Sequence, residues 1–259
     1  MKNKKSLGQH WLKNRVILDK IAELAVADLG SETGDGKVGG AATELCLEIG
    51  PGLGTLTASL LKRFKKVMAI EYDEDLARNL PKSFPGKELE VVNADILQFD
   101  LGVIKEPYVV VGNIPYYITS PIIEKLLTAE KLPERIVLLI QKEVAERIAA
   151  KKGSLLALAV ANRARVTLGP VVVKDEFTPP PKVDSQVIVL EPHSALVDGV
   201  VLSLIKRGFA APRKKLVHNL MGLKSKMELE EVLVALGLNR NARPGDLKLE
   251  DWQKLHDVL

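Results

Sequence analysis

The residues best suited to chemistry are Asn113, Ile114, Pro115 and Tyr116, which close an apolar run that begins at Tyr108. The exocyclic amine of a nucleobase is a poor nucleophile, because its lone pair is delocalised into the ring. The Asn113 side-chain oxygen and the Ile114 carbonyl are adjacent acceptors that would draw its nitrogen toward tetrahedral geometry. Pro115 restricts the backbone of Ile114, and the Tyr116 ring would stack on a flipped-out base for about 1–3 kcal/mol. These four residues predict a site that modifies a base amine.

The place of these residues in a predicted sheet supports this interpretation. The four apolar residues 108–111 before Gly112 predict a strand covered on both faces. Residues 113–116 then lie at its carboxyl end, where open α/β sheets bind ligands. The alternative is that Asn-Ile-Pro-Tyr only turns the chain from strand to loop. Two features earlier in the chain favour the site.

The first feature is a glycine-rich turn between a predicted strand over 44–49 and a predicted helix over 55–64. Gly50, Gly52 and Gly54 allow a ligand close to the backbone and to the N–H groups at the start of the helix. The turn reads Gly-Pro-Gly-Leu-Gly rather than Gly-x-Gly-x-x-Gly, and no phosphate-coordinating Lys or Arg follows it. A nucleoside without a pyrophosphate therefore fits better than a dinucleotide.

The second feature is a pair of acids at the ends of the predicted strands over 66–71 and 89–95. Glu71 stands where a carboxylate accepts hydrogen bonds from ribose hydroxyls, and Asp95 suits an adenine amine. A helix N-cap explains either acid taken singly. Three successive strand ends with Gly, Glu and Asp favour a nucleoside site. We infer S-adenosylmethionine as the cofactor, since it joins adenine and ribose to the methyl electrophile that the base-amine site requires.

Composition and length bound the class of protein. The 259 residues are 46% hydrophobic and 27% charged, which indicates a globular chain with room for one large and one small domain. The lone Cys46 excludes an internal disulfide, and no secretory signal or membrane span is recognisable, so a cytoplasmic protein is expected. A monomer is also expected, because no heptad pattern is sustained. No metal site is predicted.

Basic residues gather in two places. The first 15 residues carry five basic side chains, Lys4 and Lys5 among them, and no acid, although the net charge of the whole chain is only +4. A later patch contains Arg213, Lys214 and Lys215. Either patch alone is explained as solvated surface, but two patches on either side of a base-modifying site favour RNA as the partner.

The rest of the pattern predicts an α/β domain over 1–191 and an all-α domain over 192–259. A helix is expected from the N-cap Asn14 to Leu29, followed by a glycine-rich surface insertion over 30–43. Further helices are expected over 119–129, 142–150, 155–164, 196–209, 213–221, 228–236 and 249–258, and further strands over 135–141, 166–176 and 184–191. The proline run after Phe177 predicts a stiff loop, in which Phe177 is either a core residue or a second stacking face.

Together these residues resemble the small-subunit ribosomal RNA adenine dimethyltransferases of the KsgA/RsmA family. The resemblance spans nearly the whole chain and rests on residues 5–12, 48–54, 71, 93–95, 112–116, 141–143 and 177–185. It implies a Rossmann-like class I S-adenosylmethionine-dependent methyltransferase with a seven-stranded mixed sheet, one strand antiparallel, and a small all-α C-terminal domain. It also implies transfer of two methyl groups to each of two adjacent adenosines near the 3′ end of 16S rRNA, during ribosome biogenesis.

The resemblance further implies a role for individual residues. For the cofactor, it implies that His10 and Leu12 close over it and that Gly50 and Gly52 lie near its methionine part. It further implies that Glu71 binds the ribose, that Asp95 binds the adenine amine, and that Asn113 also contacts the cofactor. Toward the target base the implied residues are Asn113 at the amine, with Tyr116 and Phe177 on the two faces. The chain departs from the family pattern in Trp11, where Phe is more common, and in the length of the 30–43 insertion.

Two other functions fit parts of the sequence. A related methyltransferase that acts on large-subunit rRNA and confers antibiotic resistance shares the motifs, although the long 177–185 stretch and the basic C-terminal helices favour the small subunit. A ribosome-assembly or transcription factor without catalysis would share the basic patches. Such a factor would have no need for Glu71, Asp95 and residues 113–116 together. An assembly-checkpoint role beside catalysis is a further hypothesis, with immature small subunits as the partner.

Overall fold

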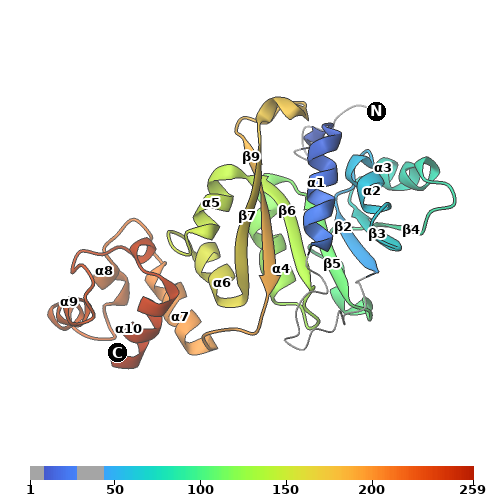
Figure 1. Cartoon of the computed structure of the whole chain (residues 1–259). Coiled ribbons are helices and arrows are strands. Elements are labelled where there is room, and N and C mark those ends of the chain that lie inside the picture. Colours follow the sequence, from blue (N-terminus) through green and yellow to red (C-terminus); the bar gives the residue numbers. More distant parts are fainter. Residues whose placement is uncertain (1–8, 28–43) are drawn as a thin grey trace, which may run out of the picture. The chain divides into compact units, whose positions relative to one another are not determined.

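The computed structural model describes residues 9–27 and 44–259 (Figure 1). The predictions for Lys4, Lys5 and the 30–43 insertion lie outside the described residues. The chain divides into two compact units, Met1–Ala145 with Thr167–Pro192, and Glu146–Val166 with His193–Leu259. The second unit thus contains the C-terminal helices expected from residue 192 and, in addition, the segment 146–166.

The first unit is built on a seven-stranded sheet of order β4-β3-β2-β5-β6-β9-β7. Its strands are β2 (Leu45–Ile49), β3 (Lys66–Glu71), β4 (Leu89–Asn93), β5 (Tyr108–Asn113), β6 (Arg135–Gln141), β7 (Ala164–Val172) and β9 (Ser185–Pro192). The pairs from β4 through β6 are parallel, and β9 runs antiparallel to β6. A separate two-stranded sheet joins β1 (Trp11–Leu12) to β8 (Phe177–Thr178). The predicted Rossmann-like fold with a seven-stranded mixed sheet is confirmed.

The helices follow the predicted pattern with shifted ends, except that α3 (Glu74–Asn79) was not predicted. They are α1 (Arg15–Val26), α2 (Thr55–Leu60), α3 (Glu74–Asn79), α4 (Thr119–Leu127), α5 (Lys142–Ala149), α6 (Leu155–Arg163), α7 (Gly199–Gly208), α8 (Leu216–Leu220), α9 (Lys226–Ala235) and α10 (Leu249–Val258). Asn14 caps α1 as predicted, since its side-chain oxygen accepts hydrogen bonds from the N–H groups of Val16 and Ile17. Helix α2 ends four residues before the predicted position, because the chain tightens there: the N–H groups of Arg63 and Phe64 both donate to the Leu60 carbonyl.

Both faces of the sheet are covered, as the apolar strands predict. Alternate residues of neighbouring strands, Val109, Val111, Val137 and Leu139, join one core cluster with apolar residues of α1 and α2. The intervening residues, such as Val110 and Leu138, are also fully buried. A sheet buried on both faces fixes the register of its strands, so the residues at their ends are placed with precision.

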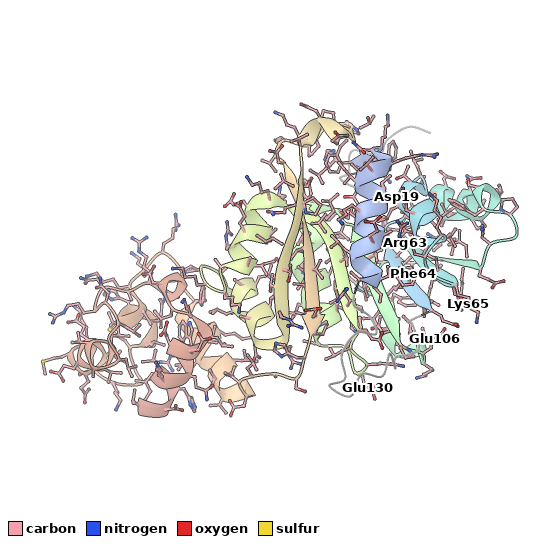
Figure 2. All side chains as sticks on the ribbon, in the orientation of Figure 1. Asp19, Arg63, Phe64, Lys65, Glu106 and Glu130 are labelled. Atoms are coloured by element: carbon pink, nitrogen blue, oxygen red, sulfur yellow. The ribbon has the colours of Figure 1, made fainter. Side chains whose placement is uncertain are left out.

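Ion pairs connect the two helices on the first of these faces. The Arg63 guanidinium, just beyond α2, lies 3.4 Å from the Asp19 carboxylate and 3.3 Å from that of Glu23, both on α1 (Figure 2). These pairs are partly exposed, so each is worth about 1 kcal/mol or less. The apolar cluster beneath them therefore contributes most of the packing between α1 and α2.

The second unit has its own apolar core. Trp252 and Leu255 of α10 are fully buried in a cluster with residues of α6, α7, α8 and α9. Helix α8 begins at Leu216, three residues after the predicted start, so the basic residues 213–215 precede the helix and are exposed. Within residues 9–27 and 44–259, none of the helices combines the length and apolar character needed to span a lipid bilayer.

Candidate active site

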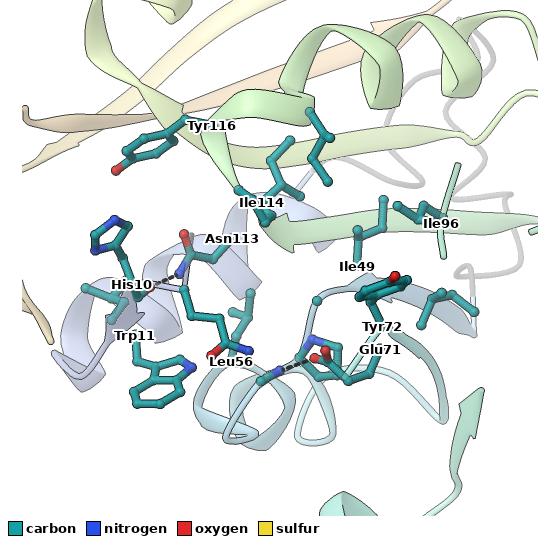
Figure 3. Close-up of a pocket in the computed structure, with 18 of the residues that line it drawn as sticks. His10, Trp11, Ile49, Leu56, Glu71, Tyr72, Ile96, Asn113, Ile114 and Tyr116 are labelled. Atoms are coloured by element: carbon teal, nitrogen blue, oxygen red, sulfur yellow. Dashed lines mark hydrogen bonds between the residues drawn. The ribbon is translucent and has the colours of Figure 1, made fainter. Parts of the chain in front are cut away.

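A cavity of about 440 Å³ opens at the carboxyl ends of the parallel strands of the first unit (Figure 3). Residues at the ends of β2, β3, β4 and β5 line it, together with residues 9–12 of the N-terminal segment. Most of the predicted site residues of the first unit contribute to its wall: His10, Leu12, Gly50, Gly52, Glu71, Asp95, Asn113, Ile114, Pro115 and Tyr116. The parallel topology therefore gathers residues separated by more than a hundred positions in the chain.

The orientation of the Asn113 amide is fixed by the backbone of the N-terminal segment. Its side-chain nitrogen donates a hydrogen bond of 3.0 Å to the His10 carbonyl. A carbonyl oxygen can only accept, so the nitrogen and not the oxygen of the amide must face His10. The side-chain oxygen points to the side on which the Tyr116 ring lies (Figure 3). Asn113 is therefore prepared to accept a hydrogen bond inside the cavity.

The Tyr116 ring is held at both its edge and its face. Its hydroxyl lies 2.7 Å from the hydroxyl of Ser185, which is fully buried at the start of β9. The His10 ring stands nearly parallel to the Tyr116 ring, with 6.0 Å between the centroids and 20° between the planes. The His10 Nδ1 atom is in turn 2.7 Å from the Pro179 carbonyl. Burial raises the pKa of the Tyr116 phenol, so the ring stays neutral around pH 7.

The glycine turn brings the backbone to the cavity. Gly50 and Gly52 have φ angles of +67° and +57°, a left-handed conformation that favours glycine. A Cβ atom on Gly50 would find only the Asn113 carbonyl oxygen within 4 Å, at 3.9 Å. One on Gly52 would lie 3.1 Å from the indole nitrogen of Trp11. The space above Gly50 is therefore open to a ligand, whereas Gly52 supports the N-terminal segment.

Glu71 is anchored by the backbone on both of its carboxylate oxygens. One oxygen accepts from the Gly52 N–H at 3.0 Å and the other from the Asp73 N–H at 2.8 Å. Burial raises the pKa of Glu71, and these two hydrogen bonds oppose the rise. The helix that follows is capped by Asp73 and not by Glu71, so the N-cap alternative does not explain Glu71. Asp95 lines the cavity and also accepts a hydrogen bond from the Leu97 N–H at 2.9 Å.

Phe177 occupies a different environment from the one that a stacking face requires. It is 3% exposed, packs in the same core cluster as Leu12, and is absent from the residues that line the cavity. Leu12 and Phe177 are direct partners in the register of β1 and β8. The structure thus brings Phe177 beneath the N-terminal segment, as in the core-residue alternative, and its contact with a base stays a prediction.

Several residues of the site have no prediction from the sequence. Trp11 contacts the glycine turn, Ser185 holds Tyr116, and Tyr72 and Tyr117 are exposed aromatic residues on the cavity wall. Ser185 ends one of the family-like stretches, but that pattern gave no hint of its partner. Tyr72 directly follows Glu71, a signal that could have been used. In the described part of the chain, no group of three or more His, Cys, Asp or Glu side chains is placed to hold a metal ion.

The basic residues 213–215 lie in the second unit, between α7 and α8. All three are exposed, and the Lys215 ammonium donates to the Asn241 side-chain oxygen at 2.6 Å. Exposed cations in one short segment provide the charge that phosphate groups require.

Comparison with known proteins identifies similar sequences over the full chain. The sequence pattern of the family described as "Ribosomal RNA adenine dimethylase" matches residues 1–259. The chain is 38% identical to "Ribosomal RNA small subunit methyltransferase A" of Thermosynechococcus vestitus, over 99% of this chain and 96% of the relative. It is 39% identical to the protein of the same name from Geobacillus kaustophilus, over 99% of this chain and 90% of that one.

Two solved structures are similar to the fold. A dimethyladenosine transferase from Plasmodium falciparum has a TM-score of 0.74 at 31% identity, over 95% of this chain and 96% of the other. The 23S rRNA methyltransferase ErmE also has a TM-score of 0.74, at 28% identity over 96% of this chain and 99% of the other.

Proposed function

Because the chain belongs to the ribosomal RNA adenine dimethylase family, we propose that it dimethylates N6 of two adjacent adenosines near the 3′ end of 16S rRNA. The observation that carries this proposal is the fixed amide of Asn113, whose oxygen is presented to the cavity beside the Tyr116 ring. An acceptor next to an aromatic face is the arrangement that a flipped-out adenine requires.

S-adenosylmethionine is the proposed cofactor, and the cavity suits it. Its wall offers an open backbone approach at Gly50, a buried anchored carboxylate at Glu71 for ribose hydroxyls, and Asp95 for an adenine amine. When bound, S-adenosylmethionine supplies the electrophilic methyl group. Leu12 and His10 belong to the segment that covers this wall, which favours their proposed role in closing over the cofactor.

The protein's own part in the reaction is to hold and polarise the target amine. The Asn113 oxygen accepts one hydrogen of the amine, and the Ile114 carbonyl, whose direction Pro115 restricts, is proposed to accept the other. Two acceptors on one nitrogen favour tetrahedral geometry and localise its lone pair. The methylated nitrogen then loses a proton to water, because the positively charged amine is a strong acid. The Tyr116 ring holds the base plane in place meanwhile.

We assign the small subunit as substrate because relatives of that name are 38% and 39% identical to the chain over nearly its full length. The exposed residues 213–215, with Lys4 and Lys5, are proposed to contact the RNA backbone. The second unit is proposed as an RNA-binding domain, and the protein as a cytoplasmic monomer. Methylation of large-subunit rRNA is the alternative that the similarity to ErmE raises.

The decisive experiment is transfer of labelled methyl from S-adenosylmethionine to unmethylated small subunits, with large subunits in parallel and digestion of the RNA to nucleosides. We expect label in N6,N6-dimethyladenosine from small subunits only. Label in large subunits would instead assign the protein to the other branch. Tight binding to small subunits without any label would contradict catalysis.

A further inference from the structure

Ser185 is the buried partner of the side chain on which the target base is proposed to stack. Its hydroxyl lies 2.7 Å from that of Tyr116, and the residue is fully buried. Tyr116 itself is half-buried and lines the cavity. The two residues are separated by 69 positions in the chain, so only the tertiary fold brings them together.

The topology of the sheet explains why this serine reaches the site. Strand β9 runs antiparallel to β6, and Ser185 is paired with Gln141, the last residue of β6. The first residue of β9 therefore lies at the carboxyl edge of the parallel strands, where the cavity opens. Tyr116 follows β5, two strands away from β9, or about 10 Å across the sheet. The phenol extends past the end of β6 to meet the serine hydroxyl.

A stacking face contributes more to binding when its position is fixed before the base arrives. A tyrosine at a cavity wall can rotate about two side-chain torsions, and ordering it on binding costs free energy. The phenol oxygen lies on the axis of the second torsion, so its hydrogen bond to Ser185 restrains the first torsion and thereby the place of the ring in advance. The nearly parallel His10 ring limits rotation about the second torsion. We propose that Ser185 is a positioning residue that holds the Tyr116 ring at the place on the cavity wall where it receives the target adenine. This inference rests on the proposed function of the cavity.

The test is a double-mutant cycle between Ser185→Ala and Tyr116→Phe, with KM for small subunits and kcat measured separately. A net hydrogen bond of roughly 0.5–1.5 kcal/mol corresponds to a change of about 2- to 12-fold. Each single variant is expected to raise KM by a factor in this range, to change kcat by a smaller factor, and to leave the Kd of S-adenosylmethionine unchanged. The KM of the double variant is expected to be no higher than that of the single variant with the higher KM, because both changes remove the same contact.

A matched control is available on β5, the strand that precedes Tyr116. The hydroxyl of Tyr108, at the start of β5, donates to the Lys131 carbonyl at 3.0 Å and lies outside the cavity wall. Tyr108→Phe therefore removes a phenol hydrogen bond from the same unit without touching the site. It is expected to lower Tm and leave KM unchanged. Ser185→Thr, which keeps the hydroxyl, is expected to restore the wild-type KM.

Three results would overturn the proposal. The first is a double variant whose KM rises by the product of the two single factors. The others are a Ser185→Ala protein with wild-type KM, and equal effects on KM from Tyr108→Phe and Tyr116→Phe. If Ser185→Ala fails to fold, a comparison of KM between Tyr116→Phe and Tyr108→Phe still tests the proposal. A wild-type KM for Tyr116→Phe would contradict the proposal. A wild-type protein without activity on small subunits would instead contradict the proposed function.

Discussion

At the scale of single residues, the carboxyl group of Glu48 is unusual because it is buried within a strand of the sheet. It is the last residue but one of β2, two positions before Gly50, and only 1% of the residue is exposed. Burial raises its pKa from 4.5 to about 8, so the native state holds the proton at neutral pH whereas the unfolded chain releases it. Between these two pKa values the native state binds more protons, and its stability therefore falls as the pH rises.

Glu48→Gln removes this linkage, because the neutral amide has a similar shape and no proton to lose. At pH 7 the cost of keeping Glu48 protonated is roughly 3 kcal/mol, from 1.36 kcal/mol per pH unit above 4.5. We expect the variant to gain stability over the wild type as the pH rises from 5 to 8, and to show little difference at pH 4. Urea denaturation across this range measures the effect. A constant difference between the two proteins at all pH values would contradict the shifted pKa.

Gly50 is a second residue for which a substitution can be predicted, because a side chain there would enter the cavity. A Cβ atom there has open space on the cavity side, but the φ of +67° makes any side chain strained by about 1 kcal/mol. Gly50→Ala is expected to fold with a slightly lower Tm and to weaken S-adenosylmethionine at least tenfold by calorimetry. Gly86→Ala, with a φ of +72° and nothing within 4 Å, is the control for strain without occupation of the cavity. Equal cofactor affinity in both variants would remove Gly50 from the binding site.

At the scale of elements, helix α1 depends on one buried arginine. Arg135, the first residue of β6, donates to the carbonyls of Leu24 and Ala27 at the end of α1. The same guanidinium lies 2.8 Å from the Glu191 carboxylate on β9. A cation at a helix C-terminus is favoured by the partial negative charge of the last carbonyls. Arg135 thereby joins the helix to two strands of the sheet.

Arg135→Met is expected to lower the free energy of unfolding by about 3 kcal/mol, because it removes the buried partner of a partly buried ion pair and leaves helix carbonyls without a donor. Glu191→Gln keeps the carbonyl contacts and is expected to cost about 1 kcal/mol. Urea denaturation gives both values, and amide exchange should show the loss of protection concentrated in α1. Equal costs for the two variants would mean that the ion pair, and not the helix contact, provides the stability.

At the scale of the whole molecule, the two units differ in how some of their basic side chains are used. Lys62, Lys65 and Lys66 of the first unit each lie within 4 Å of a carboxylate, on Asp19, Glu44 and Glu90 respectively. Residues 213–215 of the second unit are exposed and carry three positive charges in succession. Cations that neutralise RNA phosphates release counterions, which makes binding dependent on salt.

Replacement of Arg213, Lys214 and Lys215 by Ala is therefore expected to weaken binding to small subunits. The slope of log K against log salt should fall by about 2 in magnitude if all three side chains contact phosphates. S-adenosylmethionine affinity should be unchanged. The matched control replaces Lys62, Lys65 and Lys66 by Ala, which removes the same charge from the first unit. If the slope falls equally in both triple variants, the salt dependence of binding comes from net charge and not from a local RNA contact.

Most of the elements could be predicted because they depend on local patterns, although α3 and the short strands β1 and β8 were not predicted. An apolar run that ends on an acid gave β3, and a continuous apolar run gave β6, both with their observed ends. Helical spacing gave α10 and the start of α1 after Asn14. Helix ends that depend on how the chain turns, as at α2 and α8, were misplaced by three or four residues. The family resemblance drawn from the motifs is confirmed by the match over residues 1–259.

The sequence by itself determined which residues meet at the sheet edge, since parallel strands bring their carboxyl ends together and the residues there are fixed by position. Only the tertiary structure decided what holds those residues. The His10 carbonyl that orients Asn113 is a backbone atom, which carries no residue signature. The Ser185 hydroxyl reaches Tyr116 because β9 is antiparallel, and Phe177 packs in the core because β8 pairs with β1. Contacts of this kind depend on distance in space between segments that local patterns cannot relate.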